Sequence, residues 1–204
     1  QLPNLRLLVT TGMRNASIDM EAAATRGITV CGTASAGNPT PELAWGLLLS
    51  LARRIPQEDA ALRAGGWQSS LGTDLKGKTL GLVGLGRVAQ AMARYGRAFE
   101  MNVIAWSRSL TDEVASEHGA RRAEGLSALL AEADVVSLHV PLNASTRHMI
   151  DAAALSAMKP TAYLLNTSRA AVVDTEALAR ALHAGQIAGA GVDVHEPEPL
   201  AGAS

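Results

Sequence analysis

The stretch TLGLVGLGRVAQAMARYG, from Thr79 to Gly96, decides the fold of this chain. It opens with a short apolar run typical of a buried strand and closes with a helical pattern. Between them, residues 84–89 read GLGRVA and fit the pattern G-x-G-x-x-G/A. In that pattern the first glycine allows a tight turn, and the second lets a pyrophosphate approach the main chain. Because helix N-termini bind phosphate groups, the stretch predicts a dinucleotide-binding βαβ unit.

Strand-like and helical runs alternate over the rest of this region. Expected strands cover residues 79–84, 102–107, 134–140, 162–167 and 187–194, and expected helices cover residues 87–99, 126–133, 151–158 and 174–185. Such alternation predicts an α/β fold with a doubly wound parallel sheet, the Rossmann arrangement. Ligands of these sheets bind beyond the carboxyl ends of the strands.

The residues before Thr79 predict two short strands, at 5–10 and 28–31, with a helix at 17–27 between them. One long helix, Pro39–Ile55, follows and is apolar on most sides, and a shorter amphipathic piece comes after it. We expect two domains, one that includes residues 1–40 and a dinucleotide-binding domain at residues 41–204. Cys31 ends a strand-like run, so we expect a buried thiol there.

Composition excludes several classes of protein. The 204 residues carry a net charge of −1, so a nucleic-acid partner is not expected. One cysteine rules out an internal disulfide and a cysteine-built metal site, and we expect no metal. No apolar run reaches the ~18 residues of a membrane span. With no leader visible, we expect a soluble cytoplasmic protein; both ends look cut, which indicates a fragment.

An arginine follows one of the buried strands. Thr167-Ser168-Arg169 lies where the expected strand at 162–167 ends, and Asp193 and Glu198 follow the last strand. A guanidinium holds a carboxylate by two parallel hydrogen bonds, so Arg169 could grip a 2-oxo acid beside a nicotinamide. The alternative is a solvated loop arginine.

The strand at 102–107 should end beside the adenosine ribose of the cofactor. An NAD site usually has Asp or Glu there to accept from the 2′-hydroxyl, but this chain has Ser107 and Arg108. The cofactor is therefore expected to be NAD(H) or NADP(H), with a lean towards NADP(H), since Arg108 could pair with a 2′-phosphate.

Three motifs in this order resemble the D-isomer-specific 2-hydroxyacid dehydrogenase family, which contains phosphoglycerate dehydrogenase and the glyoxylate/hydroxypyruvate reductases. They are LGLVGLGRVAQAMA, LLNTSRAAVVDTEAL and AGAGVDVHEPEPL. The segment TTGMRNASIDMEAAATRGITV is similar to the substrate loop and following helix of the family's other, flavodoxin-like domain. The resemblance therefore implies that residues 1–40 are the C-terminal part of the substrate domain and that residues 41–204 are the NAD(P)-binding domain, truncated at its C-terminus. The resemblance covers nearly the whole chain and implies hydride transfer between NAD(P) and C2 of a small D-2-hydroxy or 2-oxo acid.

The resemblance also implies site residues. Arg169 would be the catalytic arginine, and Glu198 would orient a catalytic histidine. Cofactor-binding residues would be Thr11, Gly84, Gly86, Arg87, Val88, Ser107, Arg108, Val140, Pro141, Thr167 and Asp193. Gly12, Met13 and Arg14 would form the substrate loop. Helices such as the one at 41–55 build a dimer interface in the family, so we expect a homodimer.

Departures from the family pattern leave other readings open. Ala170 replaces the usual glycine and could strain its turn. His195 stands at a usually aromatic packing position, and the catalytic histidine is expected beyond residue 204. One alternative function is a non-catalytic, dinucleotide-sensing corepressor of the same fold, and another is a bare cofactor-binding module. The sequence does not identify the 2-hydroxy acid.

Overall fold

The computed structural model describes residues 2–12, 15, 17–34 and 38–198. The chain forms two compact units, Gln1–Pro39 and Thr40–Ser204. In the first unit a two-stranded parallel sheet pairs β1 with β2, and α1 connects them. The bounds are Leu7–Thr10 for β1, Met20–Thr25 for α1 and Thr29–Gly32 for β2.

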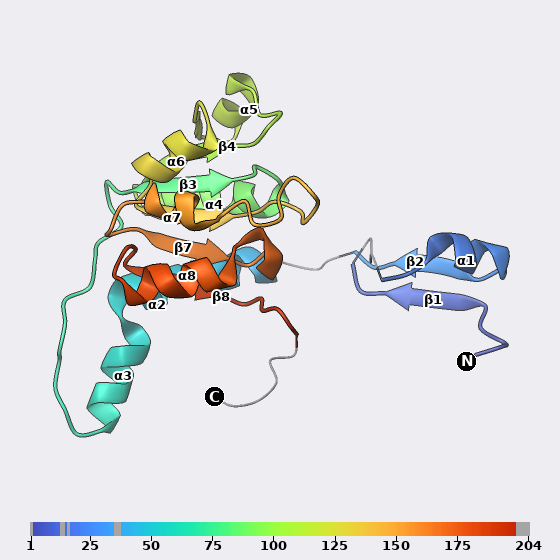
Figure 1. Ribbon diagram of the computed structural model, residues 1–204, viewed down its shortest axis with the longest axis horizontal. Helices are drawn as coiled ribbons and strands as arrows, with labels where there is room; N and C mark the ends of the chain where they lie inside the picture. The colour runs from blue at the N-terminus through green and yellow to red at the C-terminus, as the bar shows by residue number, and fades with distance from the viewer. Residues whose placement is uncertain (1, 13–14, 16, 35–37, 199–204) are drawn as a thin grey trace. The chain divides into compact units, whose positions relative to one another are not determined.

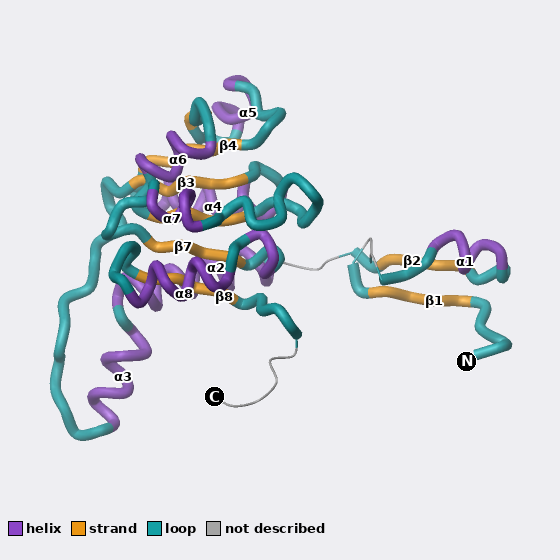
Figure 2. The backbone as a smooth tube through the Cα atoms, viewed as in Figure 1, coloured by secondary structure: helices purple, strands orange, loops and turns teal. Residues whose placement is uncertain are grey.

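The second unit contains a six-stranded parallel sheet flanked by helices (Figures 1 and 2). Its strands are β3 (Thr79–Val83), β4 (Asn102–Trp106), β5 (Arg121–Arg122), β6 (Val135–Leu138), β7 (Tyr163–Asn166) and β8 (Gly189–Val192). Its helices are α2 (Pro39–Arg53), α3 (Ile55–Arg63), α4 (Arg87–Ala98), α5 (Asp112–Glu117), α6 (Leu126–Glu132), α7 (Ala152–Ser156) and α8 (Thr175–His183), with a 3₁₀ turn, η1, at Ala170–Val172.

The strand order is β5-β4-β3-β6-β7-β8. The chain therefore enters the sheet in the middle, builds outward to β5, and then crosses to β6 on the other side of β3. This confirms the doubly wound parallel sheet expected from the sequence. It also puts the reversal of direction between β3 and β6, where such sheets bind ligands. We call the edge formed by the carboxyl ends of these strands the carboxyl rim.

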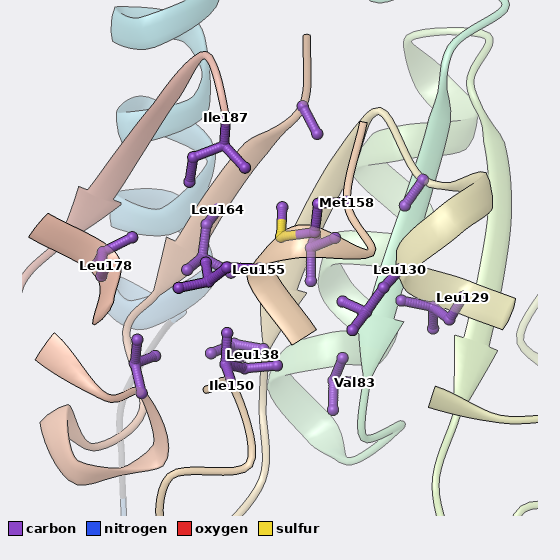
Figure 3. Packing of buried hydrophobic residues seen from close by; sticks show 14 of the residues in the cluster. Val83, Leu129, Leu130, Leu138, Ile150, Leu155, Met158, Leu164, Leu178 and Ile187 are labelled. Atoms are coloured by element: carbon purple, nitrogen blue, oxygen red, sulfur yellow. The ribbon is translucent and has the colours of Figure 1, made fainter. Parts of the chain in front are cut away.

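Two hydrophobic layers cover the sheet. On one face, side chains of α6, α7 and α8 pack against strand residues such as Val83 and Leu164. Figure 3 shows Leu155 of α7 and Leu178 of α8 in this layer. On the other face, α2 and α4 pack against Leu80 and its neighbours. Because both faces are covered, the central strands are apolar at nearly every position.

Helix α2 crosses α4 through aromatic contacts. Trp45 lies with its ring centroid 5.8 Å from that of Tyr95 and 5.0 Å from that of Phe99. At the start of α4, the small Ala89 is fully buried. A Cβ on Gly96 would come within 2.8 Å of the Leu80 side chain, so this helix lies very close to the sheet.

Two local expectations were wrong. The helix expected at 39–55 ends at Arg53, and Arg54 adopts a left-handed conformation with φ of 54° before α3 begins. Pro56 explains the break, because proline has no N–H to continue the hydrogen-bond ladder of α2. Cys31 is exposed rather than buried, because β2 belongs to a two-stranded sheet and Cys31 is paired in register with the exposed Val9.

The segment between β4 and α6 holds two elements that the sequence did not indicate, α5 and β5. Strand β5 has two arginines and joins β4 in parallel. Arg121 is ion-paired with Glu132, and Arg122 with Asp112 at 2.9 Å. Within the residues that the structure describes, no helix is long and apolar enough to cross a bilayer.

Candidate functional site

The first glycine of the loop after β3 is required by the protein itself. Gly84 has φ of +92°, a conformation that other residues rarely adopt. A Cβ built there would lie 2.7 Å from the carbonyl oxygen of His139, which follows β6. Gly84 thus lets β3 and β6 come together at the reversal point of the sheet.

The second glycine, Gly86, is not required by any contact with the described residues. It is the N-cap of α4 with an extended backbone, and a Cβ on it would meet nothing within 4 Å. Among the described residues no side chain caps the helix, and its first turn contains no acidic residue. The N–H groups at the start of this 12-residue helix are therefore open to an anion, and the helix dipole favours one.

A cavity of about 240 Å³ lies at this end of the sheet. Its lining residues are Thr40, Gly86, Arg87, Val88, His139, Val140, Pro141, Thr167 and Ser168. Six cofactor residues predicted from the sequence therefore lie together, from three separate segments of the chain. Thr40 was not predicted, since its Pro-Thr-Pro context indicates only a helix start.

Thr167 gives this cavity a polar group in need of a partner. Its Oγ1 is buried and forms no hydrogen bond within the described residues, although the residue lines the cavity. A buried hydroxyl without a partner costs about 1–3 kcal/mol. A ligand with phosphate or ribose oxygens would satisfy it, and Gly86 leaves room for such a ligand. The residues present therefore fit a dinucleotide.

His139 contributes a neutral ring to the same cavity. Its Nε2 lies 2.9 Å from the Oγ of Ser137, which is buried in β6. Burial lowers the pKa of His139 from 6.5 to about 4, so the ring is uncharged at neutral pH. His139 follows β6 and so lies at the carboxyl rim.

Arg169 follows β7 on the carboxyl rim and is exposed. Its Nη1 donates to the carbonyl oxygen of Ser168 at 2.7 Å, and within the described part of the chain it has no ion-pair partner. The expectation that Ala170 strains the turn was wrong. Ala170 begins η1 and is absent from the non-glycine residues with positive φ, so alanine fits here without cost.

Acidic groups follow the neighbouring strand β8. The N–H of Asp193 donates to the carbonyl oxygen of Asn166 at 3.4 Å, which fixes Asp193 beside the end of β7. Burial raises the pKa of Asp193, and the charge of Glu198 adds to this rise. Glu198 is exposed, and its Oε1 accepts the main-chain N–H of His195 at 2.8 Å. Asp193 and Glu198 do not line the cavity.

Ser107 and Arg108 are not among the residues that line the cavity. Ser107 is half-buried and Arg108 is exposed just after β4, and among the described residues Arg108 has no ion-pair partner. In the first unit, Thr11 is exposed, and the N–H of Gly12 donates to Thr33 Oγ1 at 3.2 Å.

Met13 and Arg14 of the expected substrate loop lie outside the described residues. Within the described ranges, no group of three or more histidine, cysteine, aspartate or glutamate side chains could hold a metal ion.

Comparison with known proteins matches residues 45–204 to the family model described as the D-isomer specific 2-hydroxyacid dehydrogenase, NAD binding domain. The chain is 46% identical to a glyoxylate reductase of Thermococcus litoralis over 97% of its own length and 62% of the relative. It is 42% identical to a glyoxylate reductase of Aeropyrum pernix over 98% and 62%. The chain thus spans about 62% of the length of these curated relatives.

Solved structures of oxidoreductases are also similar to this chain. A phosphoglycerate oxidoreductase from Vibrio cholerae is 37% identical with a TM-score of 0.89, covering 97% of this chain and 64% of the other. A D-lactate dehydrogenase from Aquifex aeolicus, complexed with NAD and lactic acid, is 34% identical with a TM-score of 0.81, covering 96% and 59%.

Proposed function

The chain belongs to the D-isomer specific 2-hydroxyacid dehydrogenase family, because residues 45–204 match its NAD-binding domain. We therefore propose that it is part of an oxidoreductase that acts on small D-2-hydroxy and 2-oxo acids. The reaction is hydride transfer between NAD(P) and C2 of the acid. The observation that carries the proposal is the cavity on the carboxyl rim. It combines an open helix N-terminus with the hydroxyl of Thr167, which has no hydrogen-bond partner among the described residues. The relatives are reductases and dehydrogenases, which favours an enzyme over a corepressor.

Residues of the cavity would hold the dinucleotide. The N–H groups at Gly86–Val88 would bind the pyrophosphate, and the Thr167 hydroxyl would bond an oxygen of the cofactor. Val140 and Pro141 would pack against a ribose, and Asp193 would accept from the carboxamide. When bound, the nicotinamide supplies or accepts the hydride.

The substrate would be handled by Arg169. Its guanidinium would leave the carbonyl oxygen of Ser168 and take the substrate carboxylate by two parallel hydrogen bonds. This fixes C2 beside the nicotinamide and polarises the adjacent carbonyl. We propose that Glu198 orients the histidine that donates the proton. Residues 1–40 would belong to the substrate domain, and Thr11 and Gly12 would bind cofactor and substrate.

Gly86→Asp tests the cofactor site. The new carboxylate would occupy the open space above α4 and repel the pyrophosphate, so NADH and NADPH binding should be lost. The fold should remain, because a Cβ there meets no protein atom. Titration calorimetry measures both affinities, and Gly46→Asp, also in open space but on α2, is the matched control. Unchanged binding in folded Gly86→Asp would sink the proposal.

For the form of the cofactor, we propose a preference for NADP(H) over NAD(H). Ser107 brings no charge to the end of β4, and Arg108 is an exposed cation without an ion-pair partner in the described residues. Ser107→Asp should shift the ratio of the NADPH and NADH dissociation constants towards NADH by about tenfold, because a carboxylate repels a 2′-phosphate and accepts from a 2′-hydroxyl. If the ratio stays constant, the ribose lies elsewhere.

The cytoplasm is the location that we propose. The free thiol of Cys31 is exposed, which suits a reducing compartment.

A further inference from the structure

Asn166 is a buried polar residue that the proposed chemistry does not use. It ends β7 and is 2% exposed. Its side chain makes three hydrogen bonds, all to the turn that leads to Arg169. Oδ1 accepts from the N–H of Ser168 at 3.1 Å and from its Oγ at 2.8 Å, and Nδ2 donates to the carbonyl oxygen of Arg169 at 3.0 Å.

These bonds join Arg169 to the rigid part of the sheet. The main-chain oxygen of Asn166 accepts the N–H of Asp193 at the end of β8. Asn166 therefore connects the backbone of Arg169 and the backbone of Asp193 to the same end of β7. An exposed arginine side chain has many rotamers, so the position of its Cα decides which part of the carboxyl rim its guanidinium can reach.

The chain offers an internal comparison at Asn143. The Oδ1 of Asn143 accepts from the N–H of Ser145 at 2.9 Å and from its Oγ, as Asn166 does with Ser168. This pair of bonds forms an ordinary turn that asparagine favours. Within the described residues, Nδ2 of Asn143 makes no further bond. Asn166 differs from the exposed Asn143 in its burial and in its bond to Arg169, and a tight turn does not need that bond.

We propose that Asn166 is a positioning residue that holds Arg169 at the distance from Asp193 at which its guanidinium meets the carboxylate of a bound 2-oxo acid. The proposal rests on the proposed role of Arg169. In this proposal the bond from Nδ2 to the carbonyl oxygen of Arg169 positions Arg169, and the two bonds to Ser168 shape the turn.

The first measurement is the backbone order of the chain by ¹⁵N relaxation. In the wild type, the amides of Ser168 and Arg169 should be as rigid as those of β7. Asn166→Ala should raise the mobility of these two amides and leave the rest of the sheet unchanged. Asn143→Ala, the matched control, should loosen only its own loop. If Arg169 stays rigid in Asn166→Ala, the proposal is overturned.

The second measurement follows ligands by titration calorimetry and by the amide shifts of Arg169. The probes are NADH and then oxamate, an unreactive isostere of a 2-oxo acid. Asn166→Ala should weaken oxamate at least ten times more than it weakens NADH. A residue with only a structural role would weaken both ligands together. Asn143→Ala removes the same pair of turn bonds at a residue outside the cavity lining, and it should change oxamate binding less than threefold.

Asn166→Asp keeps the shape and the acceptor bonds but turns an oxygen towards the carbonyl of Arg169. It should lose oxamate affinity at least as strongly as Asn166→Ala, and it serves if the alanine variant does not fold. Equal oxamate affinity in the wild type and a folded Asn166 variant would overturn the proposal. A separate variant tests whether Arg169 is the substrate anchor. If it is not, Arg169→Lys, which loses the bidentate fork, would bind oxamate as tightly as the wild type.

Discussion

His139 shows how one residue links the stability of this fold to pH. Its ring lies between the buried Ser137 and the cavity, and burial lowers its pKa from 6.5 to about 4. The folded state therefore holds the ring neutral where an unfolded chain would protonate it. The stability from this neutral ring is fully present above pH 6.5, and it is lost as the pH falls towards 4.

We predict that the free energy of unfolding falls by roughly 2 kcal/mol between pH 7.5 and 4.5 because of this group. Urea denaturation at several pH values measures it. His139→Gln should lack this part of the pH dependence, while His183→Gln, on the exposed end of α8, should keep it. Parallel pH curves for the wild type and His139→Gln would contradict the prediction.

Among the elements, the sequence predicted those whose burial pattern is strong. The strands β3, β4, β6, β7 and β8 are apolar because both faces of the sheet are covered, and α8 has an Asp174 cap that its sequence shows. Strand β5 was missed because two arginines give no apolar signal, and its pairing with β4 is visible only in three dimensions. Helix α2 was expected to run to Ile55, next to Pro56, and it ends two residues earlier because Arg54 adopts a left-handed conformation, which no local pattern indicates.

The same limit applies to the candidate site. The glycine loop and the turn at Arg169 are local patterns, so the sequence indicated them. Two features of the cavity depend on which segments meet at the carboxyl rim, and no local pattern carries that information. They are the place of Thr40 in the lining and the Thr167 hydroxyl, which has no hydrogen-bond partner in the part of the chain that the structure describes.

The break between α2 and α3 itself gives a prediction. Arg54 has φ of 54° and caps α3 without a side-chain bond. Left-handed backbone costs about 1 kcal/mol in a residue other than glycine. Arg54→Gly should therefore raise the free energy of unfolding by up to about 1 kcal/mol, measured by thermal and urea denaturation. Arg54→Ala, which keeps the strain, should not; equal gains in both variants would show that the side chain, not the backbone, was unfavourable.

At the scale of the molecule, α3 and the loop after it form an arm that we propose as the homodimer contact. Figure 1 shows α3 leading away from the six-stranded sheet and a long loop returning to β3. No residue of α3 is buried, and Leu62, Trp67 and Leu71 expose 55%, 81% and 84% of their surfaces. Exposed apolar groups of this kind mark interaction surfaces, and tryptophan is common at the centre of interfaces.

Glu58 orders this arm. Its carboxylate accepts from the hydroxyl of Ser70 and from the N–H and hydroxyl of Ser69, and these bonds lower its pKa. The loop is thereby tied to α3, so little order has to be created when two arms meet.

We predict that the chain sediments as a dimer at micromolar concentration and that Leu62→Asp with Leu71→Asp makes it a monomer. A charge in an apolar contact loses its hydration without gaining a partner. Val114→Asp, at an exposed apolar residue on α5, is the control and should leave the dimer intact. A monomeric wild type would rule out the arm as the contact.

The two glycines after β3 would respond differently to selection. Random codons at position 84 would return glycine under a screen for folded protein alone, because any Cβ there meets the carbonyl oxygen of His139. At position 86 the same screen would accept many residues, since open space surrounds it. Only a screen for cofactor capture would restore glycine at 86. Descendants of this protein that no longer need to bind a dinucleotide would therefore accept substitutions at Gly86 while they keep Gly84. Loss of glycine at position 86 alone would then indicate that cofactor binding was lost while the fold was kept.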